Sequence, residues 1–159
     1  MIEIALIVND RAVRETVEPR LLLTDFLRHR LGLTGTHVGC EHGICGACTI
    51  LLDGVAVRGC CLLAVQADGC AVATVESLAG EEHLGALQES FRRHHALQCG
   101  FCTPGILIAA TDLLARGRPT RDEIVDMLSG HLCRCTGYAP IVDAIEACVE
   151  STQASERGP

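Results

Sequence analysis

The residues best suited to chemistry are the cysteines, which number eleven in a chain of 159. Four of them follow the spacing C-x4-C-x2-C with a distant fourth member: Cys40, Cys45, Cys48 and Cys60. This spacing is typical of plant-type 2Fe-2S sites, where two bridged irons each need two thiolates. Glycines at 39, 43 and 46 let the N–H groups of the loop point at sulfur. The first set therefore predicts a cluster held by four thiolates.

A structural zinc knuckle is the main alternative for the first set, because similar cysteine gaps also occur around zinc. Five glycines between Gly32 and Gly46 favour a backbone that wraps closely around a cluster. A Rieske centre would need two histidine ligands, and no C-x-x-H follows His42. We therefore expect His42 to be a loop residue. Spacing does not decide between the adjacent Cys60 and Cys61, although in a strand they would face opposite sides and only one could ligate.

A second set consists of two close cysteine pairs: Cys99 with Cys102, and Cys133 with Cys135. One pair precedes Thr103-Pro104 and the other precedes the last expected helix, so both should lie at N-terminal helix ends. Unpaired N–H groups and the positive dipole end stabilise thiolates there. The alternatives are a thioredoxin-like C-x-x-C pair, for which no suitable strand precedes Cys99, and a zinc site.

The other cysteines, Cys61, Cys70 and Cys148, are expected to be small apolar core residues. Eleven cysteines cannot all pair as disulfides, and in a reducing compartment metal ligation explains them better. His94 and His95 have no partner at metal-ligand spacing, and the Arg92-Arg93 pair is expected to be solvated.

The elements that must position these residues change in type along the chain. Residues 2–8 and 12–17 predict a hairpin around Asn9-Asp10, and residues 49–52 and 55–57 a second one around Asp53-Gly54. A helix is expected over 22–31, ending at Gly32, and a strand over 70–75. Residues 1–76 therefore predict a small mixed sheet packed on one helix.

The second part of the chain has helical periodicity. Helices are expected around 84–91, from Thr103 to Leu114, over 124–128 and over 141–149, with Thr120 and Glu123 as a capping box for the third. Residues 82–150 therefore predict a helical domain. Residues 151–159 are polar and are expected to be a disordered tail.

Composition excludes several classes of function. The apolar fraction of 48% excludes a disordered chain, and a net charge of −7 without any lysine argues against nucleic acid as a partner. There is no secretory signal and no apolar run of eighteen residues, so a cytoplasmic protein without membrane contact is expected. No dinucleotide fingerprint, P-loop or nucleophile–base signature occurs, so we expect no catalytic residue in this chain.

Three motifs resemble the small iron–sulfur subunit of the xanthine oxidase, or molybdenum hydroxylase, family: GCEHGICGACT at 39–49, QCGFCTPG at 98–105 and LCRCTGY at 132–138. The resemblance covers residues 2–150. It implies an α+β fold, with an N-terminal plant-ferredoxin-like β-grasp domain, a C-terminal four-helix bundle and one 2Fe-2S cluster in each. It also implies a molybdopterin-binding large subunit, usually an FAD-binding medium subunit, and a complex that can itself dimerise.

The same resemblance assigns roles to residues. It makes Cys60 the fourth ligand of the first cluster, and it places Gln98 and Cys135 against the molybdopterin of the large subunit. Electrons would leave molybdenum, cross the helical-domain cluster and then the ferredoxin-like cluster, and reach FAD. Gln98 could instead cap the turn that follows it. Two other classes stay open: a zinc-stabilised interaction module, which would be colourless, and a freely diffusing two-cluster ferredoxin.

Overall fold

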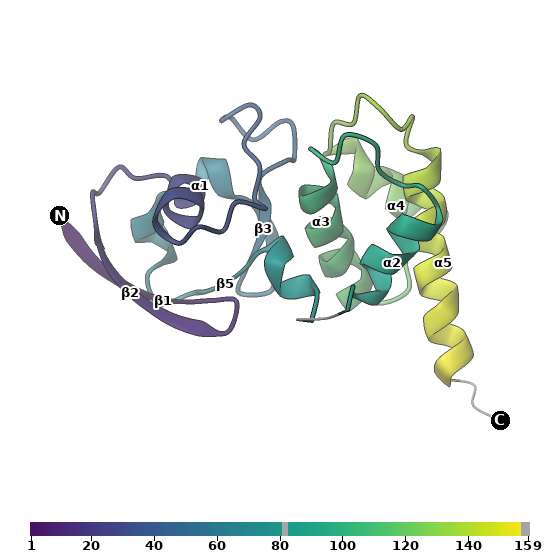
Figure 1. Cartoon of the computed structure of the whole chain (residues 1–159), viewed down its shortest axis with the longest axis horizontal. Coiled ribbons are helices and arrows are strands. Elements are labelled where there is room, and N and C mark those ends of the chain that lie inside the picture. Colours follow the sequence, from purple (N-terminus) through teal and green to yellow (C-terminus); the bar gives the residue numbers. More distant parts are fainter. Residues whose placement is uncertain (81–82, 157–159) are drawn as a thin grey trace.

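The computed structural model of the protein describes residues 1–80 and 83–156. It is elongated, with a sheet in the N-terminal half and a group of helices in the C-terminal half (Figure 1). Each half has a hydrophobic core of its own. The expected α+β class is confirmed.

One mixed sheet organises the N-terminal half. Its strands are β1 (Ile2–Val8), β2 (Arg11–Val17), β3 (Thr49–Leu52), β4 (Val55–Arg58) and β5 (Ala71–Ala73), in the order β2-β1-β5-β3-β4. Only β1 and β5 are parallel neighbours within it. Both predicted hairpins are confirmed. Asn9 and Asp10 adopt φ of 48° and 63°, as the turn between β1 and β2 requires.

The helix expected over 22–31 is present, but its hydrogen bonding changes along its length. A short α1 (Leu23–Asp25) runs directly into η1 (Phe26–Arg30), a wider π-helical turn in which the Leu31 N–H donates to the Phe26 carbonyl at 3.2 Å. Its apolar residues fill the core under the sheet, together with residues of β1 and β3: Leu23, Phe26, Leu27, Ile4 and Ile50. Gly32 follows with φ of 70° and ends the helix.

The strand expected over 70–75 is shorter in the structure. Thr74 leaves the sheet because its backbone and its hydroxyl are both bonded by the Asn9 side chain, at 2.9 Å each. The chain then forms a 3-10 turn, η4 (Val75–Leu78), whose Val75 and Leu78 pack on the core of the helical half. The segment after β5 therefore joins the two halves rather than ending the first.

The helices of the C-terminal half are α2 (Ala86–Arg93), α3 (Thr103–Ala115), α4 (Arg121–Ser129) and α5 (Ala139–Glu156). The capping box is confirmed, because the Glu123 N–H donates to Thr120 Oγ1 and Glu123 Oε2 accepts from the Thr120 N–H. Leu84, expected in the first of these helices, precedes α2 and is exposed.

The last helix continues six residues into the segment that was expected to be disordered. Residues 151–156 contain Ala, Gln and Glu, which favour helix, and no proline or glycine interrupts them. Residues 157–159 of the expected tail, and residue 82 at the expected start of the helical domain, lie outside the described residues. Within the described part of the chain, no helix is both long and apolar enough to span a membrane.

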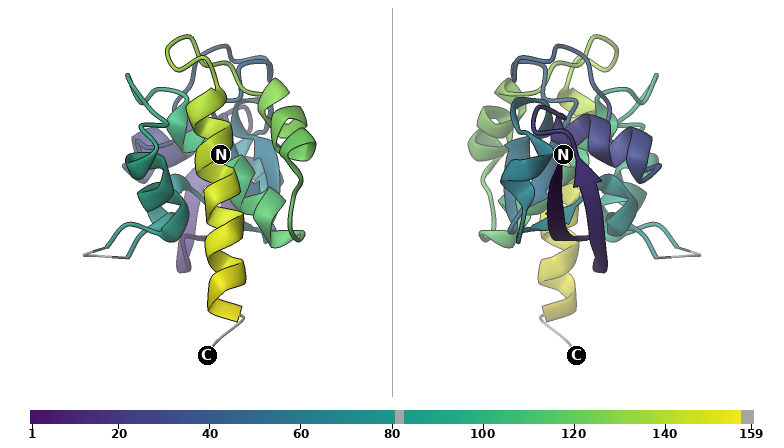
Figure 2. Two further views of the ribbon diagram at one scale, coloured as in Figure 1. Left: turned by 90° about the vertical axis from the view of Figure 1, so that its right-hand side faces the viewer. Right: turned by 90° about the vertical axis from the view of Figure 1, so that its left-hand side faces the viewer.

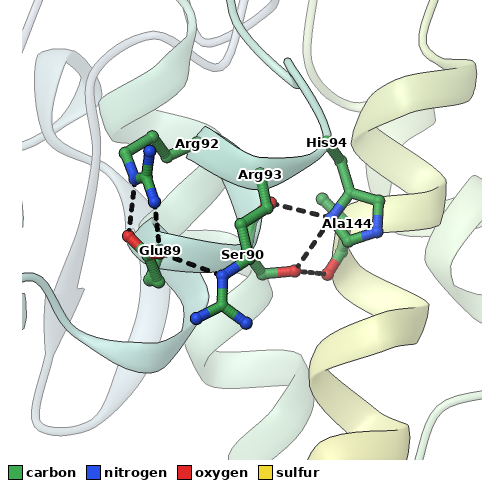
Figure 3. Close-up of polar contacts among 6 residues, drawn as sticks. All are labelled: Glu89, Ser90, Arg92, Arg93, His94 and Ala144. Atoms are coloured by element: carbon green, nitrogen blue, oxygen red, sulfur yellow. Dashed lines mark hydrogen bonds and ion pairs between the residues drawn. The ribbon is translucent and has the colours of Figure 1, made fainter.

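A buried polar contact joins helix α2 to α5, in addition to the hydrophobic core to which both helices contribute. The Ser90 hydroxyl donates to the Ala144 carbonyl at 2.6 Å, and His94 Nδ1 lies 2.8 Å from the Ser90 carbonyl on the same side (Figure 3). On the outer face, Glu89 accepts hydrogen bonds from both Arg92 and Arg93, which lower its pKa to about 2. The arginine pair is exposed, as expected.

Replacing Ser90 with alanine tests the importance of this contact. We expect Ser90→Ala to lower the free energy of unfolding by about 1 kcal/mol, because a buried hydrogen bond is lost with little change of volume. For a chain of this size that corresponds to about 2–4 °C in melting temperature. Ser129→Ala, which removes an exposed bond to the Asp126 carbonyl, is the matched control. Equal melting temperatures for the two variants would contradict the prediction.

Candidate metal centres

The cysteines of the two sets lie in loops that gather at one end of the molecule. The loop after residue 38, the loop before α3 and the loop before α5 all project beyond the helix ends on the same side (Figure 2). The first belongs to the sheet half, and the other two to the helical half. The fold thus brings together cysteines as far apart in sequence as Cys40 and Cys135.

Cys40 and Cys45 form a close pair in the first loop. The Cys45 N–H donates to Cys40 Sγ at 3.4 Å. This bond and a second one from the backbone of His42 lower the pKa of Cys40 to about 6. His42 turns its ring back to the Cys40 carbonyl and is exposed, in agreement with its expected place in the loop. The loop therefore favours a thiolate at position 40.

Cys48 and Cys60 form a second pair of the same set, and this pair is buried. The Cys60 N–H lies 3.5 Å from Cys48 Sγ, and both residues are less than 5% exposed. Burial, together with the Cys60 thiol, raises the pKa of Cys48 to about 12. A metal bound by Cys48 would therefore have to displace its proton.

The geometry of Cys60 and Cys61 differs from the strand geometry that was expected. Both lie in a 3-10 turn, η2 (Gly59–Cys61), that follows β4. Their sulfurs are 3.9 Å apart instead of facing opposite sides. The expectation was wrong because β4 ends at Arg58, one residue before Gly59, which packs under the Thr24 methyl group.

The second set also forms two pairs. Cys99 Sγ and Cys135 Sγ are 3.5 Å apart at the surface. Cys102 is buried, and burial together with the neighbouring Cys133 thiol raises its pKa to about 12. Burial also acts to raise the pKa of Cys133, but hydrogen bonds from the Thr136 hydroxyl and backbone outweigh it, so that this pKa is lowered.

Of the two pairs that are close in sequence, Cys99 with Cys102 lies at a helix end and Cys133 with Cys135 does not. Cys102 is the N-cap residue of α3, as expected. Cys133 and Cys135 lie in a loop that ends four residues after Cys135, where α5 begins at Ala139. Tyr138 fixes this loop, because its hydroxyl accepts from the Cys133 N–H at 2.9 Å and donates to the His131 carbonyl. Side-chain and backbone bonds, rather than a helix dipole, stabilise the Cys133 thiolate.

The eight thiols fit the demand of two bridged irons. A metal with tetrahedral thiolate bonds of about 2.3 Å places two of its ligating sulfurs about 3.7 Å apart. The 3.5 Å between Cys99 and Cys135 matches that separation. Each set contributes two neighbouring pairs, and two irons that share bridging sulfides take two thiolates each. Among residues 1–80 and 83–156, no three or more ligand-type side chains converge as they would around one ion.

Three cysteines outside these pairs have different environments. Cys148 is buried in the helical core, as expected, whereas Cys70 is partly exposed and weakly bonded to the Asp68 carbonyl. Cys61 is exposed, so its expected burial is wrong. It lies instead against the first cysteine loop, because a Cβ on Gly43 would be only 2.9 Å from its sulfur.

The two groups of cysteine loops are packed directly on one another. The Leu132 N–H donates to the Cys45 carbonyl at 2.9 Å, and Arg58 donates to the Gly130 carbonyl at 2.6 Å. Gly105, in the first turn of α3, approaches so closely that a Cβ there would lie 2.3 Å from the Gly46 carbonyl oxygen. This contact requires a glycine at position 105.

A buried histidine that the sequence did not single out lies in this interface. His131 is 3% exposed and contacts Gly46, where a Cβ would come within 2.5 Å of its ring. Its Nδ1 faces the Met127 carbonyl at 3.2 Å, so this nitrogen carries the proton and Nε2 faces Arg58. Burial and the Arg58 charge lower the pKa of His131 to about 4. No metal-ligand spacing marks His131, which is why spacing arguments missed it.

Gln98 and Cys135 are neighbours at the surface. The Gln98 side-chain amide donates to the Cys135 carbonyl at 3.1 Å, and both residues are exposed. The side chain therefore reaches across to the other cysteine loop and does not cap its own turn.

The fold and the paired thiols define a two-cluster iron–sulfur protein, and family models agree with that class. Residues 6–69 match the family model described as a 2Fe-2S iron-sulfur cluster binding domain, and residues 74–146 match the one described as a [2Fe-2S] binding domain.

Several relatives are similar over nearly the whole chain. The nicotine 6-hydroxylase small subunit of Paenarthrobacter nicotinovorans is 55% identical, over 91% of this chain and 87% of its own. Caffeine dehydrogenase subunit gamma of Pseudomonas sp. (strain CBB1) is 53% identical, over 94% and 92%. A crystal structure of quinoline 2-oxidoreductase from Pseudomonas putida 86 superposes with a TM-score of 0.92 at 53% identity, covering 99% of this chain and 97% of that one.

The chain belongs to the family of small iron–sulfur subunits of molybdenum hydroxylases, as its three motifs predicted. It is an electron-transfer subunit with two 2Fe-2S binding domains. The alternative of a zinc-stabilised interaction module is thereby excluded.

The contact between Gly105 and the first cysteine loop yields a stability prediction. In a helix, glycine to alanine normally gains about 1 kcal/mol. Here the added methyl group would collide with the Gly46 carbonyl, so we expect Gly105→Ala to destabilise the folded protein by about 1–3 kcal/mol instead. The melting temperature of the iron-loaded protein measures this.

Gly80→Ala is the control for this variant, since a Cβ there meets nothing closer than 3.9 Å. If Gly105→Ala melts at or above the temperature of the unmodified protein, the close contact does not exist.

Proposed function

We propose that this chain relays electrons from the molybdopterin of a large subunit, through a cluster on each of its two halves, to FAD on a medium subunit. The observation that carries the proposal is the arrangement of eight thiols as four pairs in two loop groups that touch one another. The clusters supply one-electron storage, and the chain supplies their ligands and their spacing. We assign the sheet half to a plant-ferredoxin-like β-grasp domain and the helical half to a four-helix bundle.

The ligand assignment follows the pairs. Four thiolates hold the cluster of the sheet half: Cys40, Cys45, Cys48 and Cys60. Four others hold the cluster of the helical half: Cys99, Cys102, Cys133 and Cys135. Each cluster has one pair that is at least partly exposed, namely Cys40 with Cys45 and Cys99 with Cys135, and one pair with a buried member, namely Cys48 with Cys60 and Cys102 with Cys133. The buried sulfurs then face the protein interior, and the exposed ones face the partners.

The hydrogen bond from Leu132 to Cys45 supports direct communication between the two centres. Cys45 belongs to the first ligand set, and Leu132 is bonded to Cys133 of the second. This hydrogen bond of 2.9 Å is the one non-covalent step in a path from the Cys45 sulfur, through its carbonyl and the Leu132 N–H, to the Cys133 sulfur. Arg58 holds the 130–131 segment through partly buried contacts with the Gly130 carbonyl and His131, and the His131 ring packs against Gly46 of the first loop. The spacing of the two clusters is therefore fixed by this chain alone.

The surface around the cysteines supports docking to partner subunits rather than free diffusion. Four exposed apolar side chains lie within two residues of proposed ligands: Ile44, Leu97, Phe101 and Leu132. Phe101 stacks on His37 with 4.9 Å between ring centroids, and this pair bridges the two loop groups. An exposed apolar rim of this kind suits a permanent interface with a partner subunit. We also propose a complex that can dimerise and a cytoplasmic location, where free cysteines persist.

Gln98 tests the proposed contact with the molybdopterin subunit. Gln98→Ala in the assembled complex should leave the iron content unchanged but slow the bleaching of the clusters after substrate is mixed in, as followed by stopped-flow absorption. The amide donates to the Cys135 carbonyl, and its free oxygen could accept a hydrogen bond from a pterin amine. Gln98→Glu, which keeps an acceptor but loses the donor, separates the two roles. Unchanged bleaching with Gln98→Ala contradicts the contact, and an unmodified complex whose clusters substrate never reduces contradicts the relay itself.

Serine substitutions test the fourth ligand of the first cluster. Cys60→Ser should lose about one cluster's iron and its paramagnetic signal, whereas Cys61→Ser should retain both, because Cys60 is the buried partner of Cys48. Iron analysis and EPR of the reduced protein give the answer. Iron loss in Cys61→Ser alone would show that the assignment is reversed.

A further inference from the structure

A fifth thiol lies beside the proposed ligands of the first cluster. Cys61 Sγ is 3.9 Å from Cys60 Sγ and lies over Gly43. Gly43 has φ of 83°, and any side chain at this position would occupy the space that the Cys61 sulfur fills. The first cysteine loop therefore accommodates this sulfur, although four thiolates already satisfy two irons.

We propose that Cys61 is not a ligand but a hydrogen-bond donor to the Cys60 sulfur, and that it raises the reduction potential of the first cluster. The proposal rests on the ligation by Cys60 proposed above. An iron-bound thiolate has no proton, so of the two sulfurs only Cys61 can donate. The separation of 3.9 Å is within the range for a hydrogen bond between sulfurs, and the two residues are consecutive in one 3-10 turn.

The expected effect follows from charge. Reduction adds one electron to the cluster and its thiolates, which makes their sulfurs better acceptors. A donor at a ligating sulfur therefore stabilises the reduced form more than the oxidised form. The electron arrives from the cluster of the helical half and leaves to the acceptor, while the proton stays on Cys61. The higher potential draws electrons toward the cluster nearer the acceptor.

The position of Cys61 argues against a packing role. It is exposed, and its sulfur faces the cysteine loop rather than either hydrophobic core. Cys70, by contrast, lies at the far end of β5 and bonds only weakly to the Asp68 carbonyl. This makes Cys70 a suitable control for the loss of a partly exposed thiol away from the cluster.

The test is an EPR-monitored redox titration of the assembled complex with Cys61→Ala, Cys61→Ser and Cys70→Ala, after iron analysis of each. The signal that disappears in Cys60→Ser identifies the first cluster. We expect Cys61→Ala to keep its iron. The equilibrium constant for reduction of this cluster should fall by up to tenfold, which corresponds to a reduction potential lower by about 59 mV for one electron. Cys61→Ser keeps an O–H donor and should largely preserve the potential. The other cluster, and both clusters in Cys70→Ala, should not shift.

Full iron with an unmoved first potential in Cys61→Ala overturns the hydrogen bond but leaves the relay intact. An equal shift of both clusters also overturns it, because the cause would then be a general structural change. Iron loss in the Cys61 variants shows instead that Cys61 is a ligand, which refutes the ligand assignment on which this inference rests.

Discussion

The approach of the two cysteine loop groups to one another is the constraint on which the rest of the structure depends. Segments 40–48 and 130–135 meet at backbone level, with the Leu132 N–H on the Cys45 carbonyl and Gly105 against the Gly46 carbonyl. At Gly46 and Gly105 the approach is so close that neither position has room for a side chain. The sheet and the helices then serve as two rigid supports that present these loops to each other.

The buried polar groups of the interface follow from the same constraint. Two backbones that meet away from water must have their carbonyls satisfied, because an unpaired buried carbonyl costs about 1–3 kcal/mol. Arg58 supplies donors to Gly130 and Thr49, and the Thr49 hydroxyl donates to the Gly46 carbonyl. His131 completes the set in its neutral form, since a second proton would place a charge beside the Arg58 guanidinium. Stability and inter-cluster spacing are thus provided by the same contacts.

Much of this fold could be predicted from the sequence because its signals are local. The Asn9-Asp10 and Asp53-Gly54 turns, the Thr120 cap and the cysteine spacings each depend on a few adjacent residues, and the structure agrees with the expected elements there. The features that the sequence did not predict depend on contacts between distant residues. The end of β5 is set by Asn9, which is 65 residues away from Thr74, and the turn at Cys60 and Cys61 by packing of Gly59 on Thr24. Both contacts join residues that are far apart in the sequence, so hydrophobic periodicity within a short window does not reveal them.

The candidate metal centres show the same contrast between local features that the sequence predicts and long-range contacts that it does not. Motif spacing predicted eight cysteines as ligands, and the structure brings them together in pairs, but the spacing did not predict that Cys61 would lie beside Cys60 or that Arg58 and His131 would join the loops. The pKa values explain why these features matter together. Cys48 and Cys102 are neutral thiols when no metal is bound, with pKa values near 12, because their burial opposes a charge. Iron bound by Cys48 and Cys102 would have to displace these protons, and the charge of the resulting thiolates would be offset in part by the cluster and in part by backbone N–H groups. The packing that raises the pKa of these two thiols would also keep water away from a cluster that they hold.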